Sequence, residues 1–257
     1  MKLTFLGTGT STGVPQIGCK CDTCRSTDTR DKRFRASAIL SLDSGINILI
    51  DCGPDFRSQI LRVDSPPLTA LMITHSHYDH VGGIDDLRPY CHGEDFPVWC
   101  KADVAQDLRE RNPWSFRENP YPGVPTFELN IIEPFKKFAI EEVNITPLLI
   151  MHAKLPILGF RFDNTLTNKS IAYITDCKTM PPETLERLRD LDVLVINALR
   201  YEEHISHMTV PEALAVVDKV KPRQSFFTHI CHRMGRHDDV KLPPGVSLAY
   251  DGLTISV

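Results

Sequence analysis

Several features that would assign this chain to a functional class are missing from its sequence. No run of about 18 apolar residues occurs, so no transmembrane helix is expected. The first residues lack the basic start and long apolar run of a secretory signal, and we therefore expect a cytoplasmic protein. The 29 basic residues are outnumbered by 33 acidic ones. This net charge of -4 argues against a protein that wraps nucleic acid or lies on a membrane.

Two residue types are abundant instead. The 257 residues include ten histidines and eight cysteines, within a composition of 42% hydrophobic and 24% charged residues that is ordinary for a globular protein. In a reducing compartment, closely spaced cysteines serve more often as metal ligands than as disulfide partners. The spacing of the histidines and cysteines therefore decides whether they indicate metal sites.

Short apolar runs separated by turn residues are typical of β-strands and occur along the whole chain. We expect strands at residues 2–6, 38–42, 46–50, 70–74, 98–101, 145–151, 159–162, 171–175, 193–197, 225–229 and 246–257, the last with a turn at Asp251 and Gly252. Helices are predicted at residues 181–191 and 210–220, the second with Thr209 as its N-cap, and on weaker patterns at 79–90 and 102–111.

The order of these elements favours β-sheets covered by helices, because strands come in groups at first and alternate with helices later. No repeat, low-complexity tract or linker divides the chain, so we expect one α/β domain over residues 1–257. Residues 112–134 are rich in Pro, Asn and aromatic residues and predict an irregular loop. If the chain forms a homodimer, this loop is the expected contact.

A cluster of histidines follows the strand predicted at residues 70–74. The segment HSHYDH contains His75, His77, Asp79 and His80, and alternation along an extended chain places His75 and His77 on the same side. Three imidazoles and a carboxylate in six residues are hard to explain by packing, since each buried polar group needs its own partner. Such a set suits a divalent ion such as zinc, iron or manganese.

Further ligands are expected at other strand ends. His152, Asp176 and His229 each occupy the carboxyl end of a predicted strand. One histidine at a strand end is an ordinary observation. Three candidate ligands at strand ends, in addition to the HSHYDH cluster, indicate that the strands place metal ligands along a common edge of the sheets.

The HSHYDH motif, followed in order by His152, Asp176 and His229, resembles the metal-binding pattern of the metallo-β-lactamase superfamily. The segment NILIDCG at residues 47–53 is similar to the first motif of that superfamily, in which the aspartate, here Asp51, supports the site without binding an ion. The resemblance covers essentially the whole chain. It implies a single-domain αββα four-layer sandwich with two metal ions at the strand ends.

The same resemblance implies how the ligands are divided between two divalent ions. One ion would be bound by His75, His77 and His152, and the other by Asp79, His80 and His229, with Asp176 bridging them. Two ions about 3.5 to 4 Å apart can share a hydroxide that exists at neutral pH and attacks the substrate. The sequence does not decide between zinc, manganese and iron.

A cysteine cluster predicts a third ion. Cys19, Cys21 and Cys24 lie within six residues and can surround one tetrahedral zinc, which leaves the fourth position to His232 or Cys231. A CxCxxC loop with a late THxxH pair, here THICH, is similar to the phosphoribosyl 1,2-cyclic phosphate phosphodiesterase branch of the superfamily. This resemblance favours His232 and a structural zinc.

The expected reaction is the hydrolysis of a small phosphodiester, with a cyclic phosphoribosyl or nucleotide phosphate as the implied substrate. The leaving group needs a proton, and His207, just before the helix predicted at 210–220, is the expected general acid. Asp79 is expected in the catalytic centre. No role is predicted for His92, His204 or His237. The remaining cysteines are expected to be ordinary reduced thiols without a role: Cys52, Cys91, Cys100, Cys177 and Cys231.

Three alternatives remain from the sequence. A transfer RNA 3′-processing endoribonuclease shares the metal ligands, but only 24 positions separate His152 from Asp176, which leaves no room for its long substrate-binding arm. A lactone or thioester hydrolase would use the same fold. A non-catalytic accessory protein of pyrroloquinoline quinone biosynthesis is disfavoured, because all seven superfamily ligand positions are occupied.

Overall fold

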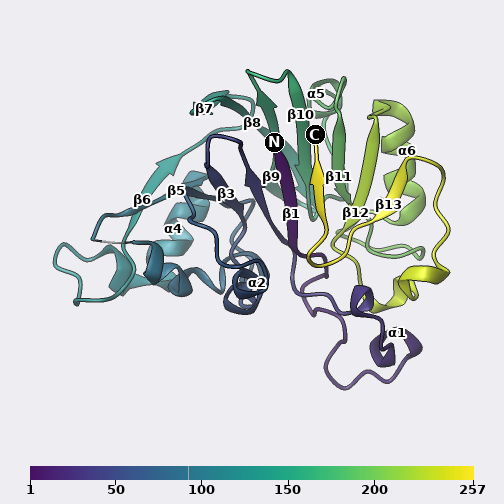
Figure 1. The fold of residues 1–257 in the computed structure, drawn as a ribbon, viewed down its shortest axis with the longest axis horizontal. Coiled ribbons are helices and arrows are strands. Elements are labelled where there is room, and N and C mark those ends of the chain that lie inside the picture. Colours follow the sequence, from purple (N-terminus) through teal and green to yellow (C-terminus); the bar gives the residue numbers. More distant parts are fainter. Residues whose placement is uncertain (92) are drawn as a thin grey trace.

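Two seven-stranded β-sheets form the centre of the computed structural model, which describes residues 1–91 and 93–257 (Figure 1). His92 lies outside the described residues. The first sheet has the order β14-β1-β2-β3-β4-β5-β6, with strands Lys2–Gly7 (β1), Ser37–Ser41 (β2), Asn47–Ile50 (β3), Ala70–Met72 (β4), Phe96–Cys100 (β5), Phe127–Ile131 (β6) and Thr254–Ser256 (β14). The second has the order β13-β12-β11-β10-β9-β8-β7, with strands Phe138–Ile140 (β7), Val143–His152 (β8), Leu155–Asn164 (β9), Lys169–Ile174 (β10), Val193–Asn197 (β11), Gln224–Thr228 (β12) and Val246–Leu248 (β13).

Both sheets combine antiparallel and parallel pairs in the same way. In the first sheet the pairs from β14 to β3 are antiparallel and those from β3 to β6 are parallel. In the second sheet the pairs from β7 to β10 are antiparallel and those from β10 to β13 are parallel. Parallel neighbours end at the same edge of a sheet, so the loops after β3 and β4, and after β10 and β12, gather side chains there.

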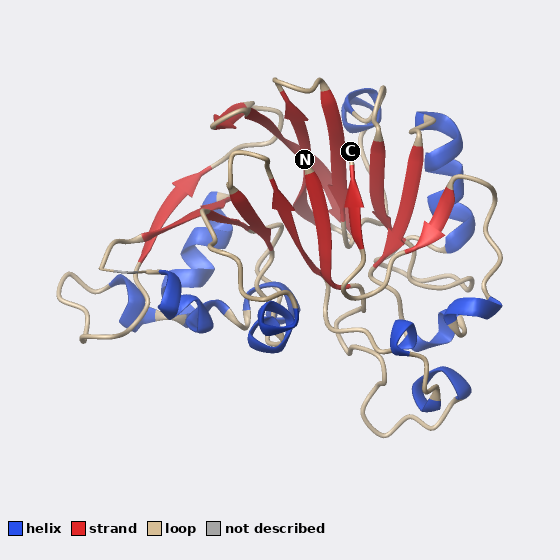
Figure 2. Ribbon diagram, viewed as in Figure 1, coloured by secondary structure: helices blue, strands red, loops and turns tan. Residues whose placement is uncertain are grey.

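Helices lie against the outer faces of the two sheets and in the loops beyond the strand ends (Figure 2). They are Asp22–Arg25 (α1), Phe56–Arg62 (α2), Tyr78–Val81 (α3), Ala102–Arg111 (α4), Pro182–Arg187 (α5) and Val210–Val220 (α6), with 3-10 turns at Thr29–Asp31 (η1), Ile84–Tyr90 (η2), Pro113–Phe116 (η3), His232–Met234 (η4) and His237–Asp239 (η5). Within the described part of the chain, no helix combines the length and apolar character needed to cross a membrane.

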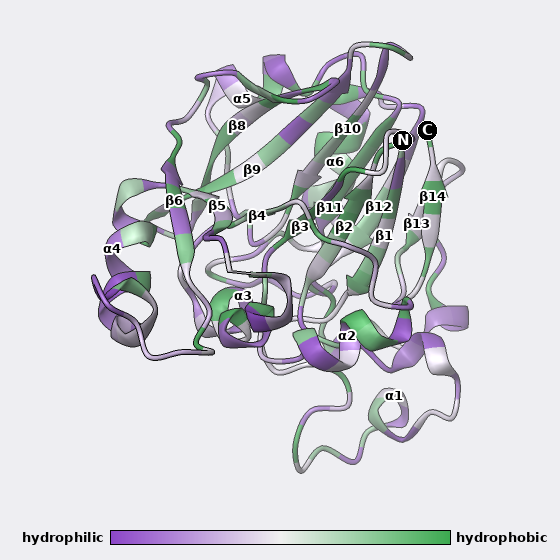
Figure 3. Ribbon diagram, turned by 60° about the vertical axis from the view of Figure 1, so that its left-hand side comes forward, coloured by the Kyte–Doolittle hydropathy of each residue, from purple (hydrophilic) through white to green (hydrophobic). Residues whose placement is uncertain are grey.

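Three apolar clusters separate four layers. Phe5, Leu40, Phe160 and Tyr173 belong to a cluster between the sheets, where they are fully buried. A second cluster joins the first sheet to α2 and α4, and a third joins the second sheet to α5 and α6. The apolar strands are visible in Figure 3. The expected αββα sandwich is therefore confirmed.

Helices α4 and α6 begin and end where the sequence predicts. Thr209 caps α6 by accepting a hydrogen bond from the Glu212 N–H, and the Glu212 carboxylate accepts one from the Thr209 N–H at 2.7 Å. This reciprocal capping box satisfies backbone donors that would otherwise lack partners at the start of the helix. The predicted helix at 181–191 is shorter, since α5 ends at Arg187.

Other predictions need correction. The predicted irregular loop at 112–134 contains η3 and β6, because β6 pairs in parallel with β5 and extends the first sheet. The predicted helix at 79–90 is divided into α3 and the 3-10 turn η2, which contains Pro89. The predicted strand pair at 246–257 is split between the sheets: β13 pairs with β12, whereas β14 pairs with β1. The sequence analysis missed α1, α2 and β7.

Candidate metal centre

The residues predicted as metal ligands lie where strands end. His152 is the last residue of β8, Asp176 lies two residues beyond β10, and His229 directly follows β12. Asp51 directly follows β3, and Asp51, Asp176 and His229 all have left-handed backbones, with φ of 58°, 56° and 55°. Few residues with a side chain adopt this conformation, although Asp and His do so more readily than most. These turns end the strands at the edge where the candidate ligands meet.

The loop that carries the HSHYDH motif packs closely on the loop after β3. A Cβ atom on Gly53 would lie 2.0 Å from the Asp79 carbonyl oxygen, and one on Gly83 would lie 2.0 Å from the Gly53 carbonyl oxygen. The backbone N–H of Cys52 donates to the His80 carbonyl oxygen at 2.7 Å. Because only glycine fits at positions 53 and 83, these two residues allow the motif to reach the end of β3.

Four of the predicted ligands form one compact group. The ligand atoms of Asp79, His80, Asp176 and His229 all lie within 4.8 Å of one another, and all four residues are buried. His80 Nε2 lies 3.2 Å from a carboxylate oxygen of Asp79 and 3.2 Å from one of Asp176. His229 Nε2 lies 3.1 Å from the other oxygen of Asp176. This group contains all three predicted ligands of the second ion together with the predicted bridge.

A second group shares one member with the first. The ligand atoms of His152, Asp176 and His207 also lie within 4.8 Å of one another. The Nδ1 atom of His207 is 3.8 Å from a carboxylate oxygen of Asp176, and the rings of His207 and His152 are 4.7 Å apart between centroids. Asp176 is thus the carboxylate common to both groups. His207, the predicted general acid, lies inside the centre beside it.

His75 and His77 face His152 across the same space. Their ring centroids are 4.5 Å apart, and they lie 5.8 and 5.2 Å from the ring centroid of His152. Neither residue belongs to the two compact groups. The ring of His75 is also 4.2 Å from that of His80, so it lies between the two sides of the centre. The structure therefore brings all seven predicted ligands into one centre, with His77 on the His152 side of it.

A buried carboxylate sets the tautomer of His80. The Nδ1 atom of His80 is 2.7 Å from Asp51, and Asp51 also accepts hydrogen bonds from the N–H and hydroxyl of Thr74 at 2.8 and 2.9 Å. Since Nδ1 is bonded in this way, Nε2 is left to face the centre. This is the contact expected of Asp51. The Thr74 hydroxyl also lies 3.0 Å from Nδ1 of His75, a contact that the sequence analysis missed.

Backbone carbonyl groups set the tautomer of His152. Its Nδ1 atom is 3.0 Å from the carbonyl oxygen of Asp176 and 3.1 Å from that of Ser206. A protonated Nδ1 that donates to these oxygens leaves Nε2 free to bind an ion. Nothing in the sequence identifies Ser206, because its contribution is a backbone atom.

Several buried nitrogens in the centre have no hydrogen-bond partner among the described residues. They are Nε2 of His75 and His80, both ring nitrogens of His229, and Nδ1 of His207. Nε2 of His80 and Nε2 of His229 are within ion-pair distance of carboxylates, whereas the other three nitrogens have no carboxylate of the described residues within hydrogen-bond distance. An unpaired buried polar atom is costly, and natural proteins contain few of them. Their concentration beside two carboxylates fits divalent ions, for which imidazole and carboxylate are suitable ligands.

The charges of the centre are also consistent with the binding of divalent ions. Although burial opposes charge, Asp176, Asp51 and Asp79 raise the pKa of His80 well above its usual value, and Asp176 and Asp79 raise the pKa of His229 to about 9. In the metal-free protein, protons on these rings offset the carboxylate charge. A divalent ion can replace those protons, as metal binding at histidine sites generally requires.

The cysteine cluster meets His232 at a separate place. The Sγ atoms of Cys19 and Cys21 lie 3.3 and 3.4 Å from Nδ1 of His232, and all four ligand atoms, including that of Cys24, are within 4.8 Å of one another. His232 lowers the pKa of Cys21 to about 6, despite the opposing effect of burial. Three sulfurs and one nitrogen are the ligand set of a tetrahedral structural zinc. Cys231 is buried outside this group.

One short segment joins the two candidate metal sites. His229 belongs to the first and His232 to the second, and Ile230 between them pairs with the glycine-rich loop after β1. The N–H of Ile230 donates to Thr8 at 2.8 Å, and its carbonyl oxygen accepts from Thr10 at 3.1 Å. The cysteine loop is thereby attached to the edge that carries the histidine and aspartate groups.

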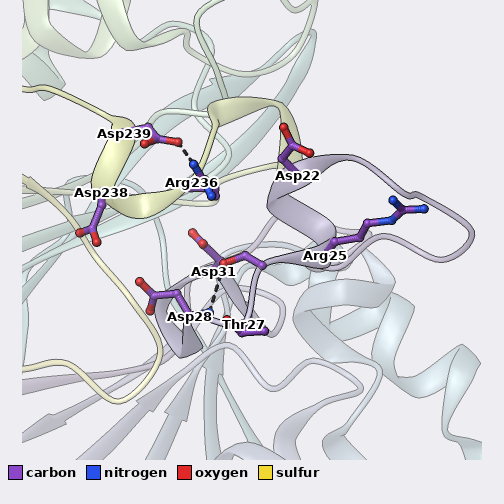
Figure 4. A pocket seen from close by; sticks show the side chains of 9 residues that line it. Asp22, Arg25, Thr27, Asp28, Asp31, Arg236, Asp238 and Asp239 are labelled. Carbon is purple, nitrogen blue, oxygen red and sulfur yellow. Dashed lines mark hydrogen bonds and ion pairs between the residues drawn. The ribbon is translucent and has the colours of Figure 1, made fainter.

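A cavity of about 510 Å³ lies beside the cysteine cluster (Figure 4). Its lining includes the acidic residues Asp22, Asp28, Asp31, Asp238 and Asp239, together with Arg25 and Arg236. Arg236 is paired with Asp239 at 2.9 Å. No three of these carboxylates form a compact ligand group within the described residues, in contrast to the two sites above.

Comparison with known proteins agrees with this geometry. Residues 46–230 match the family model of the β-lactamase superfamily domain. The chain belongs to this superfamily. A solved structure described as a new diphosphatase from the PhnP family shares 34% sequence identity and a TM-score of 0.90 with this chain, and the match covers 99% of this chain and 96% of that one.

Two further proteins with similar sequences are not described as diphosphatases. An octanoyltransferase of Porphyromonas gingivalis (strain ATCC BAA-308 / W83) is 41% identical over 256 residues, which cover 98% of this chain and 51% of that protein. The chain therefore spans about half the length of this relative. Coenzyme PQQ synthesis protein B of Methylorubrum extorquens (strain PA1) is 24% identical over 226 residues, covering 79% of this chain and 74% of that protein.

A likeness in fold also links this superfamily member to human tRNase Z, short form, with a TM-score of 0.76, 19% identity, and coverage of 100% of this chain and 99% of that one. At that identity the likeness concerns the fold alone. Between His152 and Asp176 the chain is filled by β9, β10 and the turn between them. No long arm is inserted there, as the sequence predicts.

The remaining histidines lie at or outside the edge of the centre. His204 stacks on His207 with 5.0 Å between ring centroids, so it lies closer to the centre than the sequence suggested. The backbone N–H of His237 donates to Asp31 at 2.7 Å, in the region beside the acidic cavity. Its ring lies 3.4 Å from a guanidinium nitrogen of the buried Arg33, which is a structural contact.

Proposed function

We propose that this chain is a di-metal hydrolase that cleaves a small phosphodiester, including cyclic phosphates of ribose or of nucleotides. The observation that carries this proposal is that Asp176 belongs both to the group with Asp79, His80 and His229 and to a second group with the ligand His152 and the proposed acid His207. One carboxylate common to two adjacent sets of imidazole and carboxylate ligands suits two ions held side by side. When bound, two divalent ions activate water and neutralise the charge on the oxygens of a reacting phosphate.

The proposed ligand division follows the seven predicted residues. The residues that would hold one ion are His75, His77 and His152, those that would hold the other are Asp79, His80 and His229, and Asp176 would contact both. Zinc, manganese and iron all suit this donor set, and the third ion, at the cysteine cluster, is proposed to be zinc.

His207 is proposed to protonate the leaving group. Its ring lies 4.7 Å from the rings of both His152 and His229, so a phosphate bound at the centre would be beside it. Burial, reinforced by His229, lowers the pKa of His207 to about 2 in the protein alone. A negatively charged substrate next to the ring raises that pKa, because an opposite charge favours the protonated form. Protonation favoured in this way would allow His207 to act as the general acid.

The relationship to the PhnP-family diphosphatase supports phosphate chemistry. That protein is described as a diphosphatase, and the match extends over nearly all of both chains. A diphosphate linkage and a phosphodiester present the same tetrahedral phosphorus to a nucleophile. We therefore include diphosphate-linked compounds among the substrates to be tested.

The similarity to half of an octanoyltransferase favours a second candidate, hydrolysis of an octanoyl ester or thioester. Two exposed apolar residues flank the centre: Leu155 pairs across the β8-β9 turn with His152, and Ile205 precedes Ser206. Leu155 is 40% exposed and Ile205 is 83% exposed, so both are available to an acyl chain. This candidate uses the same ions and differs in the bond that is cleaved.

A substrate panel separates these functions. The metal-loaded protein would be tested with bis-aryl phosphodiesters, ribose cyclic phosphates, 2′,3′-cyclic nucleotides, diphosphate-linked nucleosides, short RNA, lactones and octanoyl thioesters. We expect turnover of the small phosphodiesters that disappears after chelation and returns with added ions. Turnover confined to octanoyl thioesters or lactones would contradict the phosphodiesterase and favour the second candidate. Cleavage of RNA alone would contradict both.

A further inference from the structure

His77 differs from the other candidate ligands in its support. His80 is held by Asp51, His152 by two backbone carbonyl groups, and His75 lies beside the Thr74 hydroxyl. The side chain of His77 is exposed, and none of the hydrogen bonds among residues 1–91 and 93–257 involves its ring. Metal-binding histidines usually have such a partner, which fixes the orientation of the ring. Something else must therefore position His77.

The residue before His77 is held on two sides by helix α4. The hydroxyl of Ser76 donates to the carboxylate of Asp107, and the guanidinium of Arg111 donates to the backbone carbonyl oxygen of Ser76. Asp107 and Arg111 are four residues apart, so they lie one above the other on the same face of α4. The two contacts fix both the side chain and the backbone of Ser76.

The geometry of an extended chain explains why Ser76 is the residue that α4 holds. Successive side chains of an extended segment point to opposite sides. His75 and His77 face the centre and each other, with ring centroids 4.5 Å apart, so Ser76 between them points away from it toward α4. A contact to Ser76 therefore acts on both histidines without entering the centre.

Helix α4 is itself well anchored. Val104, Ala105 and Leu108 are buried in the apolar cluster beneath the first sheet, with exposures of 4%, 0% and 0%. Asp107 and Arg111 lie along one edge of this buried face, three residues after Val104 and Leu108, where they reach the loop that carries Ser76. A rigid helix is a suitable support for a ligand loop, because supporting contacts position a site only as well as they are themselves fixed.

We propose that Asp107 and Arg111 are positioning residues of the metal centre, which hold the His75–His77 segment in place for ion binding through Ser76. They would hold His77 through its neighbour Ser76, whereas Asp51 holds His80 by a direct contact to its ring. The inference rests on the proposed metal centre and is independent of the substrate. Neither residue is expected to touch substrate or an ion.

The test measures ion affinity in the full chain. Wild-type, Asp107→Ala, Arg111→Ala and Arg109→Ala would be equilibrated with Zn²⁺ or Mn²⁺ against a series of chelators, and bound ions would be counted by elemental analysis. Arg109 is the matched control, because it lies on the same helix with its guanidinium 6.0 Å from the Phe116 ring. We expect the first two variants to bind one active-site ion about 10- to 100-fold more weakly. The other two ions, and all three ions in Arg109→Ala, should keep their wild-type affinity.

Further variants separate positioning from general loss of structure. Ser76→Ala removes the hydroxyl that reaches Asp107 but keeps the carbonyl that reaches Arg111. Adding Asp107→Ala to Ser76→Ala should therefore change the ion affinity no further, whereas adding Arg111→Ala should. Absorption spectra of the Co²⁺-loaded variants report the altered geometry of one ion directly.

Three results would overturn the proposal. The first is wild-type ion affinity in both Asp107→Ala and Arg111→Ala. The second is an equal loss of all three ions in these variants. The third is that Asp107→Ala weakens ion binding as much in the Ser76→Ala protein as in the wild type. If an Asp107 variant fails to fold, Ser76→Ala alone tests the same contact. Weakened ion binding in a protein without phosphodiesterase activity would refute the proposed function and leave this inference standing.

Discussion

The two candidate metal regions differ in what holds their ligands in place. The histidine and aspartate centre lies at the ends of β-strands, with Asp79, His80, Asp176 and His229 buried and its rings braced by Asp51 and by backbone carbonyls. The cysteine cluster lies in the loop around α1 and in η4, with Cys19, Cys21 and His232 partly exposed. In Figure 1 the α1 loop extends beyond the ends of the strands.

This contrast suggests different roles for the ions proposed at the two sites. The strand-end ligands are positioned by strands that pack against the apolar clusters, so we expect the fold to survive loss of the proposed ions. The cysteine loop has little core of its own, and Cys24 is the one buried sulfur of its cluster. A zinc bound there, as proposed, would supply the cohesion that apolar packing supplies elsewhere, as in other closed structural sites.

The change expected to have the largest effect removes the carboxylate shared by both ligand groups. Asp176→Ala should reduce phosphodiester hydrolysis by at least about 1000-fold, because the ions supply several kcal/mol of charge stabilisation. Elemental analysis should show two ions lost and the cysteine-bound ion retained. Asp163→Ala is the control, since Asp163 is paired with Arg161 at 2.9 Å on β9, outside both ligand groups. Loss of the cysteine-bound ion from Asp176→Ala would contradict the view that the two metal regions are independent.

The next largest effect tests the residue that the structure places inside the centre. His207→Ala should reduce the turnover of a phosphodiester with a poor alkoxide leaving group by about 100- to 10,000-fold, the usual range for general acid catalysis. An activated aryl leaving group departs without a proton, so its turnover should change little. Steady-state rates with the two substrates measure the difference. Equal losses would show that His207 binds an ion or substrate instead of donating a proton.

Removal of a cysteine should affect stability more than chemistry. Cys24→Ala is expected to release the structural ion and lower the unfolding free energy by about 3 kcal/mol, since loss of a structural metal is among the large single-residue effects. Limited proteolysis should then cut near residues 19–25. Cys231→Ala is a close control, because Cys231 is also buried but lies outside the ligand cluster. Similar behaviour of the two variants would contradict a structural ion.

The stability of the metal-free protein should depend on pH in a way that the loaded protein does not show. Asp176 and Asp79 raise the pKa of His229 from 6.5 to about 9 against the effect of burial. Stability from a raised pKa is complete below 6.5 and is lost as the pH rises through 9, by at most about 3 kcal/mol. Denaturant unfolding of the chelated protein at pH 6.5 and 9 measures this loss. A loaded protein with the same loss would show that ions do not replace the proton.

Much of this account could be predicted from the sequence, where the signal is local. The HSHYDH motif, the capping residue Thr209 and the CxCxxC loop each act over a few residues, so their spacing is sufficient. Asp51 could be predicted because it lies in a recognisable motif. Helix α2 is short, with Phe56 and Ile60 as its buried apolar positions, and was missed.

Contacts between distant residues could not be predicted in this way. The contacts of Ser76 with Asp107 and Arg111 join positions 31 and 35 residues apart, and nothing in the sequence of α4 distinguishes these two from its other charged residues. Strand β6 was missed because its pairing with β5, and not its own composition, extends the sheet. Ser206 contributes a backbone oxygen, which any residue supplies.

The central claim is that two of three ions perform the chemistry and the third maintains the shape. It is tested most directly by adding ions stepwise to protein that mild chelation has left with one ion, while phosphodiester turnover is measured. We expect the one remaining ion to be held by the cysteine cluster, this form to be folded and inactive, and turnover to reach its maximum at two added ions per chain. Full turnover before any ion is added would contradict it.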